Sequence, residues 1–334
     1  MKKILLTTLT IVGSALIIQS CKKDNLTQNP STLSASERTV KIGDLTTIMP
    51  EGYDPEILNY SETDLDHILH GLKLEKDSTV LDIYYLDSIT QPIIANYPIL
   101  STSEENSEEV LSTVSDDFGG VSEEVIMENI EEINDYYSVL VRTDLLEKLL
   151  KIEKGAGPYS YQPKPTIFGG LNLKEILILI GHPLWIGECE DAAYDAKLMT
   201  TQMTYQNDPT DNRADGFRHI MWNYLLCKYI GYDNENVSET VEFVRRITNA
   251  HEYSSSNSIS SAMDYHNNYI GRYLFSSQAY YHKNCTFCPT QLLCPDHYVV
   301  AEYVRGTLMT AGIKATTVAT INLVPQLTLV FIAE

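Results

Sequence analysis

The chain has 334 residues, with 45 acidic and 24 basic side chains, a formal net charge of −21 and 43% hydrophobic residues. We expect no nucleic-acid partner, because a phosphate backbone would be repelled, and the same charge disfavours adhesion to anionic lipid headgroups. The hydrophobic content is enough to bury the core of one or two domains, which excludes disorder of the whole chain.

The N-terminus has the layout of an export signal. Two lysines near the start are followed by the uncharged, mostly apolar residues 4–18, and the small Ser20 directly precedes Cys21. An uncleaved membrane anchor is the alternative, but the apolar run is shorter than the roughly 20 residues that a bilayer span needs. This ending resembles the lipobox of bacterial lipoproteins, which implies removal of residues 1–20 and lipidation of Cys21. We therefore expect an exported protein that the lipid anchors to a bacterial membrane, most simply the outer membrane, facing the periplasm or the surface.

The next two segments differ in composition. Residues 21–50 are rich in Ser, Thr, Asn and Lys, and they predict a flexible tether. Residues 51–154 predict an acidic α+β region. Its expected elements are a helix from Ser61, a strand over 79–85 and a helix over 122–151. The acidic run 104–135 lacks the alternating Asp/Asn loop of a calcium site, so we expect it to form a solvated face.

The rest of the chain is predicted to be mainly α. A Gly/Pro-rich break at 155–165 predicts a linker, and apolar residues at helical spacing over 166–313 predict a helical-bundle domain. The expected helices are 171–180, 183–203, 214–230, 238–251, one from about 261, and 298–310. Gly231 is expected to cap the third of these helices. The tail 314–334 predicts one or two short strands.

Polar groups of catalytic type gather in three stretches of this domain. In the first, Asp215, His219 and Asn223 are four residues apart, which puts them on one face of a helix. That arrangement suits a carboxylate that orients an imidazole and fixes its tautomer. Arg218 joins the candidate catalytic set, and the alternative is that it only pairs with a carboxylate.

The other two stretches add further acids and an imidazole. His251 and Glu252 end a predicted helix, so their side chains can turn into a cleft between helix ends. Asp264 and Asn268 share a face of the next helix, and Asn267 lies beside them. Together the groups predict a site for a divalent metal such as zinc, with an open position for water. The expected metal ligands are His219, His251 and Asp264.

The three stretches resemble the motifs of an uncharacterised bacterial domain family. The shared patterns are Asp-x-Phe-Arg-His with a nearby Trp-Asn, then Ala-His-Glu, then Asp-x-x-Asn-Asn-x-x-Gly. They stand at residues 215–223, 250–252 and 264–271. The resemblance extends from near His182 to near Gly306, and it implies no particular activity because the family is one of unknown function.

Five cysteines follow the lipidated one, an odd number for an exported chain, so at least one is expected to be free or to pair between molecules. Cys285, Cys288 and Cys294, followed by His297, imitate a zinc site, but the gap between the second and third cysteines is too short for a typical zinc finger. Outside the cytoplasm, a disulfide among these three cysteines is the expected outcome. Cys227, inside an apolar helix, is expected to be a buried thiol.

Two functions remain open. The first is a hydrolase-like site around His219, which would act as a base or a metal ligand oriented by Asp215. His251, Glu252 and Asp264 would complete this site. Asn267 and Asn268 would position substrate or bridge helices. The second is a binding or assembly lipoprotein, in which the same residues form a structural hydrogen-bond network.

Overall fold

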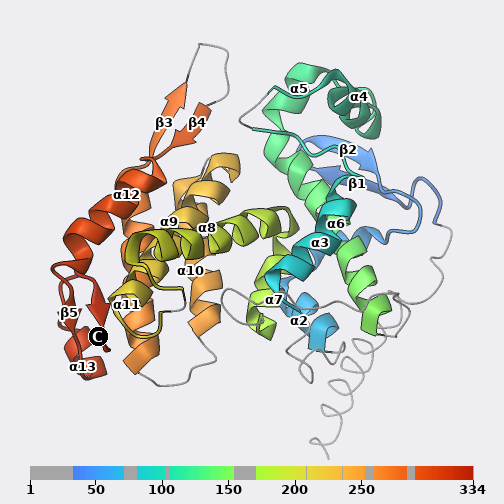
Figure 1. Ribbon diagram of the computed structural model, residues 1–334. Coiled ribbons are helices and arrows are strands. Elements are labelled where there is room, and N and C mark those ends of the chain that lie inside the picture. Colours follow the sequence, from blue (N-terminus) through green and yellow to red (C-terminus); the bar gives the residue numbers. More distant parts are fainter. Residues whose placement is uncertain are drawn as a thin grey trace, which may run out of the picture.

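The computed structural model describes residues 33–70, 81–102, 105–153, 171–207, 209–234, 236–252, 259–283 and 290–333. Across these ranges the chain is mainly helical, and its strands form short two-stranded sheets (Figure 1). This confirms the predicted mainly-α class, with a small α+β region before the C-terminal helices. The predicted signal, Cys21 and the predicted linker 155–165 lie outside the described residues.

The N-terminal part combines one hairpin with several helices. Strands β1 (Thr39–Ile42) and β2 (Leu45–Ile48) pair antiparallel, with Thr39 opposite Ile48. The helices that follow are η2 (Pro55–Asn59), α2 (Glu62–His70), α3 (Ile83–Ile94), α4 (Glu108–Asp117), α5 (Glu123–Glu128) and α6 (Ile130–Glu153).

Two sequence predictions for this part are wrong. The tether predicted over 21–50 contains the β1–β2 hairpin, and Leu45 packs with Met49 in a hydrophobic core because β2 alternates buried and exposed residues. In the range 79–85, where a strand was predicted, α3 begins at Ile83, and residues 79 and 80 lie outside the described ranges. There the Asp82 carboxylate accepts a hydrogen bond from the Tyr85 N–H and caps the helix.

The C-terminal part is a helical bundle that ends in short strands. Its helices are α7 (Leu173–Gly181), η4 (Pro183–Trp185), α8 (Ile186–Thr204), α9 (Arg213–Asn234), α10 (Val237–Glu252), α11 (Ile259–Ser276), α12 (His297–Tyr303), the π-helical η5 (Val304–Met309) and α13 (Val318–Ile321). Its strands are β3 (Tyr280–Lys283), antiparallel to β4 (Thr290–Leu293), and β5 (Ile313–Lys314), parallel to β6 (Val330–Phe331). The cap predicted at Gly231 is wrong, because α9 continues through this glycine, whose missing side chain leaves room for the Phe275 ring.

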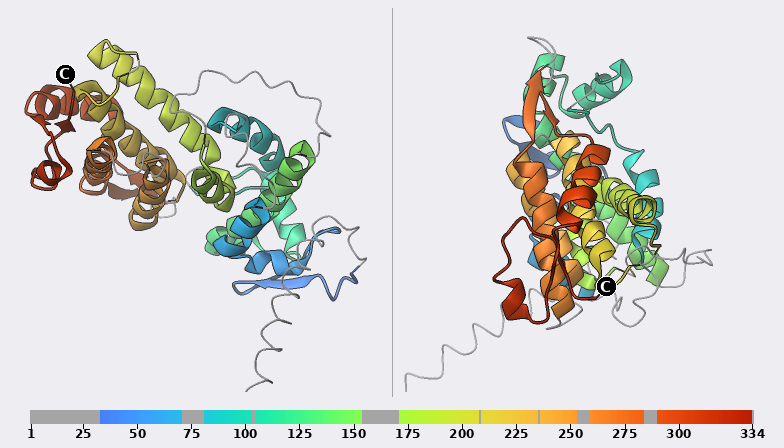
Figure 2. Two further views of the ribbon diagram at one scale, coloured as in Figure 1. Left: turned by 90° about the horizontal axis from the view of Figure 1, so that it is seen from below. Right: turned by 60° about the vertical axis from the view of Figure 1, so that its left-hand side comes forward.

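Hydrophobic packing is continuous between the two parts. Helix α6 gives Tyr137 and Leu140 to an N-terminal core and Val141 and Leu145 to a larger main core. The main core also contains residues of α3 and of α7 to α12. Figure 2 shows α8 extending from the C-terminal helices toward the N-terminal part. Side chains of the acidic region and of the helical domain therefore pack together in the main core.

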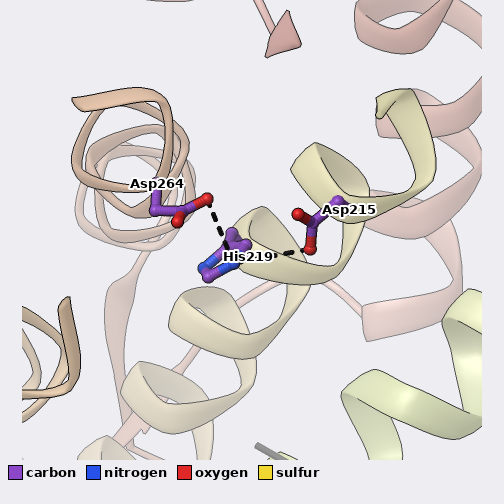
Figure 3. Close-up of side chains that lie close together, drawn as sticks. All are labelled: Asp215, His219 and Asp264. Atoms are coloured by element: carbon purple, nitrogen blue, oxygen red, sulfur yellow. Dashed lines mark ion pairs between the residues drawn. The ribbon is translucent and has the colours of Figure 1, made fainter. Parts of the chain in front are cut away.

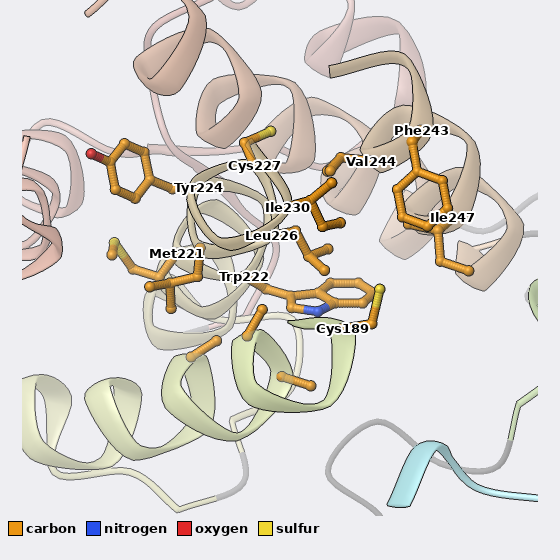
Figure 4. Packing of buried hydrophobic residues seen from close by; sticks show 14 of the residues in the cluster. Cys189, Met221, Trp222, Tyr224, Leu226, Cys227, Ile230, Phe243, Val244 and Ile247 are labelled. Carbon is orange, nitrogen blue, oxygen red and sulfur yellow. The ribbon is translucent and has the colours of Figure 1, made fainter. Parts of the chain in front are cut away.

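Helix α9 is the central element of the bundle. It packs against α8 on one side and against α10 and α11 on others, and Figure 4 shows Trp222 of α9 close to Cys189 of α8. Because neighbours surround this helix, three of its polar residues, Asp215, His219 and Asn223, are buried along with apolar ones. Among the helices of the described ranges, none is both long and apolar enough to cross a membrane.

Candidate functional site

The first turn of α9 brings Asp215 into the centre of the bundle. Asn212 caps the helix, since its Oδ1 accepts hydrogen bonds from the N–H groups of Ala214 and Asp215. Asp211 has a left-handed φ of 59°, and its N–H donates to Asp215 Oδ2 over 2.6 Å. A carboxylate in this first turn also faces the positive end of the helix dipole. Contacts within residues 211–215 thus help to hold the Asp215 carboxylate in place.

His219, one turn later, lies between acids of three helices. Its Nε2 is 3.6 Å from Asp215 Oδ1 and 3.2 Å from Asp264 Oδ1 of α11 (Figure 3). Its Nδ1 is 3.6 Å from Glu252 Oε1 at the end of α10 and 3.1 Å from Asn268 Oδ1. His219 is only 3% exposed. Burial lowers the pKa of His219 well below its ordinary value, helped by the charges of Arg218 and His251, so the imidazole is neutral.

The acids around His219 are crowded and buried. Burial raises the pKa of Glu252, although His251, Asn268 and Asp264 beside it act in the opposite direction. Burial raises the pKa of Asp264 to about 9, with the negative charges of Glu252 and Asp215 adding to the effect. Arg218 offsets part of this charge through a 2.6 Å ion pair with Asp215 Oδ1.

His251 is near this cluster but has a partner of its own. Its Nδ1 lies 2.8 Å from Glu175 Oε1 of α7, and its ring meets the Trp222 ring edge to face. Burial opposes the charged form of His251, yet the hydrogen bond and charge of Glu175, with the charge of Glu252, raise its pKa above the ordinary value. Glu175 also forms a capping box with Asn172, the only role its sequence pattern would predict.

The two adjacent asparagines of α11 point to different places. Asn268 faces His219, Glu252 and Asn223. Asn267 instead pairs with the backbone of Val330, donating from Nδ2 to its carbonyl and accepting from its N–H. The structure therefore assigns Asn267 to holding strand β6 against α11, and the prediction that it positions substrate is not supported.

A second group of buried polar residues extends the site away from the acids. Asn223 Oδ1 accepts hydrogen bonds from Arg272 Nη1 over 2.6 Å and from Thr248 Oγ1 over 3.1 Å. All three side chains are at most 7% exposed. The sequence drew attention to Asn223 through its spacing, but a lone Thr or Arg on an amphipathic helix gives no comparable signal.

The residues that could bind a metal are Asp215, His219 and Asp264. One ligand atom from each lies within 4.8 Å of the other two, and no other such group occurs in the described ranges. The structure places Asp215 in this set, where the sequence predicted His251. Among the described residues, nothing donates a hydrogen bond to the buried Asp264 Oδ1. An imidazole nitrogen and two carboxylates fit Zn²⁺ or a similar transition metal.

Of the cysteine-rich stretch 285–297, for which a disulfide was predicted, the structure describes residues 290–297. Cys294 is a free thiol, so the predicted disulfide is not confirmed at this residue, while Cys285 and Cys288 lie outside the described ranges. His297 accepts a 3.0 Å hydrogen bond at Nδ1 from Lys228 Nζ. Cys227 is fully buried, as predicted.

Residues 176–292 match the model of a family described as a domain of unknown function, DUF6973. The matched range contains the whole His219 cluster, and it confirms that an uncharacterised domain is present without assigning an activity. No curated protein and no solved structure matches the chain.

Proposed function

We propose that the protein is a metal-dependent hydrolase whose centre is built by Asp215, His219 and Asp264. The observation that carries the proposal is the convergence of three ligand atoms from α9 and α11 within 4.8 Å. In this group, the buried Asp264 Oδ1 lies 3.2 Å from His219 Nε2 and accepts no hydrogen bond from the described residues. Buried polar atoms are normally paired, so an oxygen without a donor beside a second carboxylate fits a place for a cation.

Electrostatics support a cation rather than an empty cluster. Three carboxyl groups lie within reach of one neutral imidazole, and the Arg218 guanidinium forms an ion pair with one of them, Asp215. Without a cation, burial and the charges of Glu252 and Asp215 raise the pKa of Asp264 to about 9, which favours its protonated form. A divalent cation would replace that proton and stabilise both aspartates in the charged form.

The surrounding residues supply the other requirements of hydrolysis. When bound, a divalent cation acts as a Lewis acid and lowers the pKa of a water molecule in its open position. Glu252 lies beside His219, and burial raises its pKa above the ordinary value, so we assign it the role of accepting and releasing a proton. The Arg218 and His251 side chains are 15% and 19% exposed, so a substrate would approach from their side.

The rival function is structural, and one observation favours it. The Asn223, Thr248 and Arg272 side chains form a buried, connected network of the kind that fixes helix register. The two proposals differ in what the Asp215–His219–Asp264 side of the cluster does. A structural network needs no cation there.

Metal analysis of the purified full chain separates the two functions. After dialysis, we expect one equivalent of a transition metal by elemental analysis, or Zn²⁺ binding with one-to-one stoichiometry by titration. Asp264→Asn should lower the affinity at least tenfold. Glu242→Gln is the matched control, since Glu242 lies on the exposed side of α10 paired with Arg245, and it should bind like the wild type. A folded wild type that binds no metal would support the structural rival.

We also propose that the protein is exported and lipid-anchored at Cys21, which would place this centre outside the cytoplasm. The support is the signal-like sequence before Cys21. Membrane fractionation and mass spectrometry of the N-terminus test it. Wild type should carry acyl chains and sediment with membranes, and Cys21→Ala should do neither.

A further inference from the structure

Donor and acceptor roles in the buried network follow from Arg272. A guanidinium has only N–H donors, so the Asn223 atom that lies 2.6 Å from Arg272 Nη1 must be the amide oxygen. At its other end, the Asn223 amide nitrogen lies 3.0 Å from the backbone carbonyl of His219, which can only accept. Burial lowers the pKa of Arg272 to about 10, which still leaves it charged at neutral pH. Both neighbours thus orient the Asn223 amide in the same way.

The orientation of Asn223 determines that of Asn268. The Asn223 amide nitrogen lies 2.6 Å from Asn268, and only an oxygen can accept that hydrogen bond. The Asn268 amide nitrogen is then left to donate to Glu252 Oε1, over 3.2 Å. The Glu252 carboxylate can only accept, so it also requires the Asn268 nitrogen on its side. Asn223 and Glu252 therefore orient the Asn268 amide in the same way.

The oriented Asn268 oxygen decides where the proton of His219 sits. This oxygen is 3.1 Å from His219 Nδ1 and accepts a hydrogen bond only if Nδ1 is protonated. Glu252 Oε1, 3.6 Å from Nδ1, favours the proton on the same nitrogen. Since a neutral imidazole carries one N–H, Nε2 keeps its lone pair, and this lone pair faces Asp215 and Asp264 (Figure 3).

We propose that Arg272 is a positioning residue that acts through Asn223 and Asn268 to hold His219 as the Nδ1–H tautomer, with Nε2 free to bind a cation. Asp264 Oδ1 lies 3.2 Å from Nε2 and accepts no hydrogen bond from the described residues. With its N–H on Nδ1, His219 leaves Nε2 available to a cation beside the two aspartates. The role in cation binding rests on the proposed function, while the tautomer itself does not.

The tautomer can be read directly from ¹⁵N chemical shifts of the histidine ring nitrogens in the metal-free protein. The His219 signals are assigned by their loss in His219→Gln. We expect wild type to show a protonated Nδ1 and an unprotonated Nε2. A protonated Nε2 in folded wild type would overturn the inference, whatever the variants do.

Asn223→Asp tests whether Asn223 sets the orientation of Asn268 and thereby the tautomer of His219. The substitution changes the shape of the side chain little. Aspartate keeps the acceptor for Arg272 but cannot donate to Asn268, so the Asn268 amide should turn and present its nitrogen to both residue 223 and His219. We expect the His219 proton to move to Nε2 and Zn²⁺ affinity to fall at least tenfold. We call the hydrogen bonds that lead from Arg272 through Asn223 and Asn268 to His219 the relay. An unchanged tautomer in the folded variant would contradict it.

Thr248→Val is the control for a lost hydroxyl in the same buried network. It leaves the Arg272–Asn223–Asn268 chain intact, so the tautomer should stay at Nδ1–H and Zn²⁺ affinity should change less than twofold.

A second pair of variants, at Arg272, keeps the test decisive if Asn223→Asp does not fold. Arg272→Lys retains a donor and should preserve the tautomer, whereas Arg272→Met should yield a mixture of both. Equal spectra for these two would argue against a role for Arg272.

The two proposals fail separately in these experiments. Wild type with the Nδ1–H tautomer but no metal affinity would overturn the hydrolase proposal and leave the relay standing. Wild type that binds Zn²⁺ but carries the proton on Nε2 in its metal-free state would overturn the relay alone.

Discussion

Gly271 of α11 lies directly against the backbone carbonyl of Ile220 on α9. A Cβ at residue 271 would clash with that oxygen and would lie 2.7 Å from the Cβ of Asn223. The two helices can approach this closely only because residue 271 has no side chain. The same crossing brings Asp264 and Asn268 of α11 within contact distance of His219.

Gly271→Ala should therefore destabilise the protein by about 3 kcal/mol, as overpacking against atoms that cannot move does. Urea unfolding followed by circular dichroism measures the loss. Gly306→Ala is the matched control, because a Cβ there meets nothing within 4 Å and alanine favours a helix by up to about 1 kcal/mol. If both variants behave alike, the close crossing does not limit stability.

The sequence predicted the helices well because their signals are local. Apolar spacing and caps indicated the helices over 183–203 and 238–251, and the structure has α8 at Ile186–Thr204 and α10 at Val237–Glu252. It failed where tertiary packing overrides a local signal. Gly231 resembles a helix cap, but α9 continues past it, and the glycine instead makes room for the Phe275 ring.

The candidate site was only partly predictable for the same reason. Four-residue spacing placed Asp215 and His219 together, because both belong to one helix. The sequence could not show that His251 would pair with Glu175, which is far away in the chain. Arg272 likewise gave no signal, since its role depends on how α9 and α11 cross.

Asp264→Asn should raise the stability of chelator-treated protein by about 2 kcal/mol. Asp264 is buried beside two other acids, and its pKa of about 9 means that folding at neutral pH requires it to take up a proton. Asparagine resembles the protonated acid and removes that requirement. Thermal unfolding with and without Zn²⁺ is the measurement. The cation should raise the melting temperature of wild type and leave the variant unchanged, and a destabilised variant would show that the carboxylate itself supports the fold.

Asn267→Ala should loosen the C-terminal segment without weakening metal binding. It removes two hydrogen bonds, of 2.9 and 3.0 Å, to the backbone of Val330. The expected loss is about 2 kcal/mol, since the buried Val330 groups lose their partners. Hydrogen exchange at the Val330 amide should accelerate. Asn96→Ala, at an exposed asparagine, should change stability by less than about 0.5 kcal/mol. A large fall in Zn²⁺ affinity in Asn267→Ala would show instead that Asn267 contributes to the metal site.

His182 should make the protein less stable in mild acid. Its ring stacks on Trp185 and meets the edge of Phe243. Burial, with the charges of Arg246 and Arg142, lowers its pKa from 6.5 to about 4. Below pH 6.5 the unfolded chain therefore takes up a proton that the folded chain refuses, and stability falls until about pH 4, where the folded state is protonated too.

His182→Phe isolates this effect from the titration of the carboxylates, because it keeps an aromatic ring in the stack and has no proton to gain. Between pH 7.5 and 4.5, wild type should lose about 2 to 3 kcal/mol more than the variant, from a shift of roughly 2.5 pKa units at 1.36 kcal/mol each. Urea unfolding at both pH values measures the difference. Parallel pH profiles for the two proteins would mean that His182 titrates normally in the folded state, and that its stack with Trp185 opens to water.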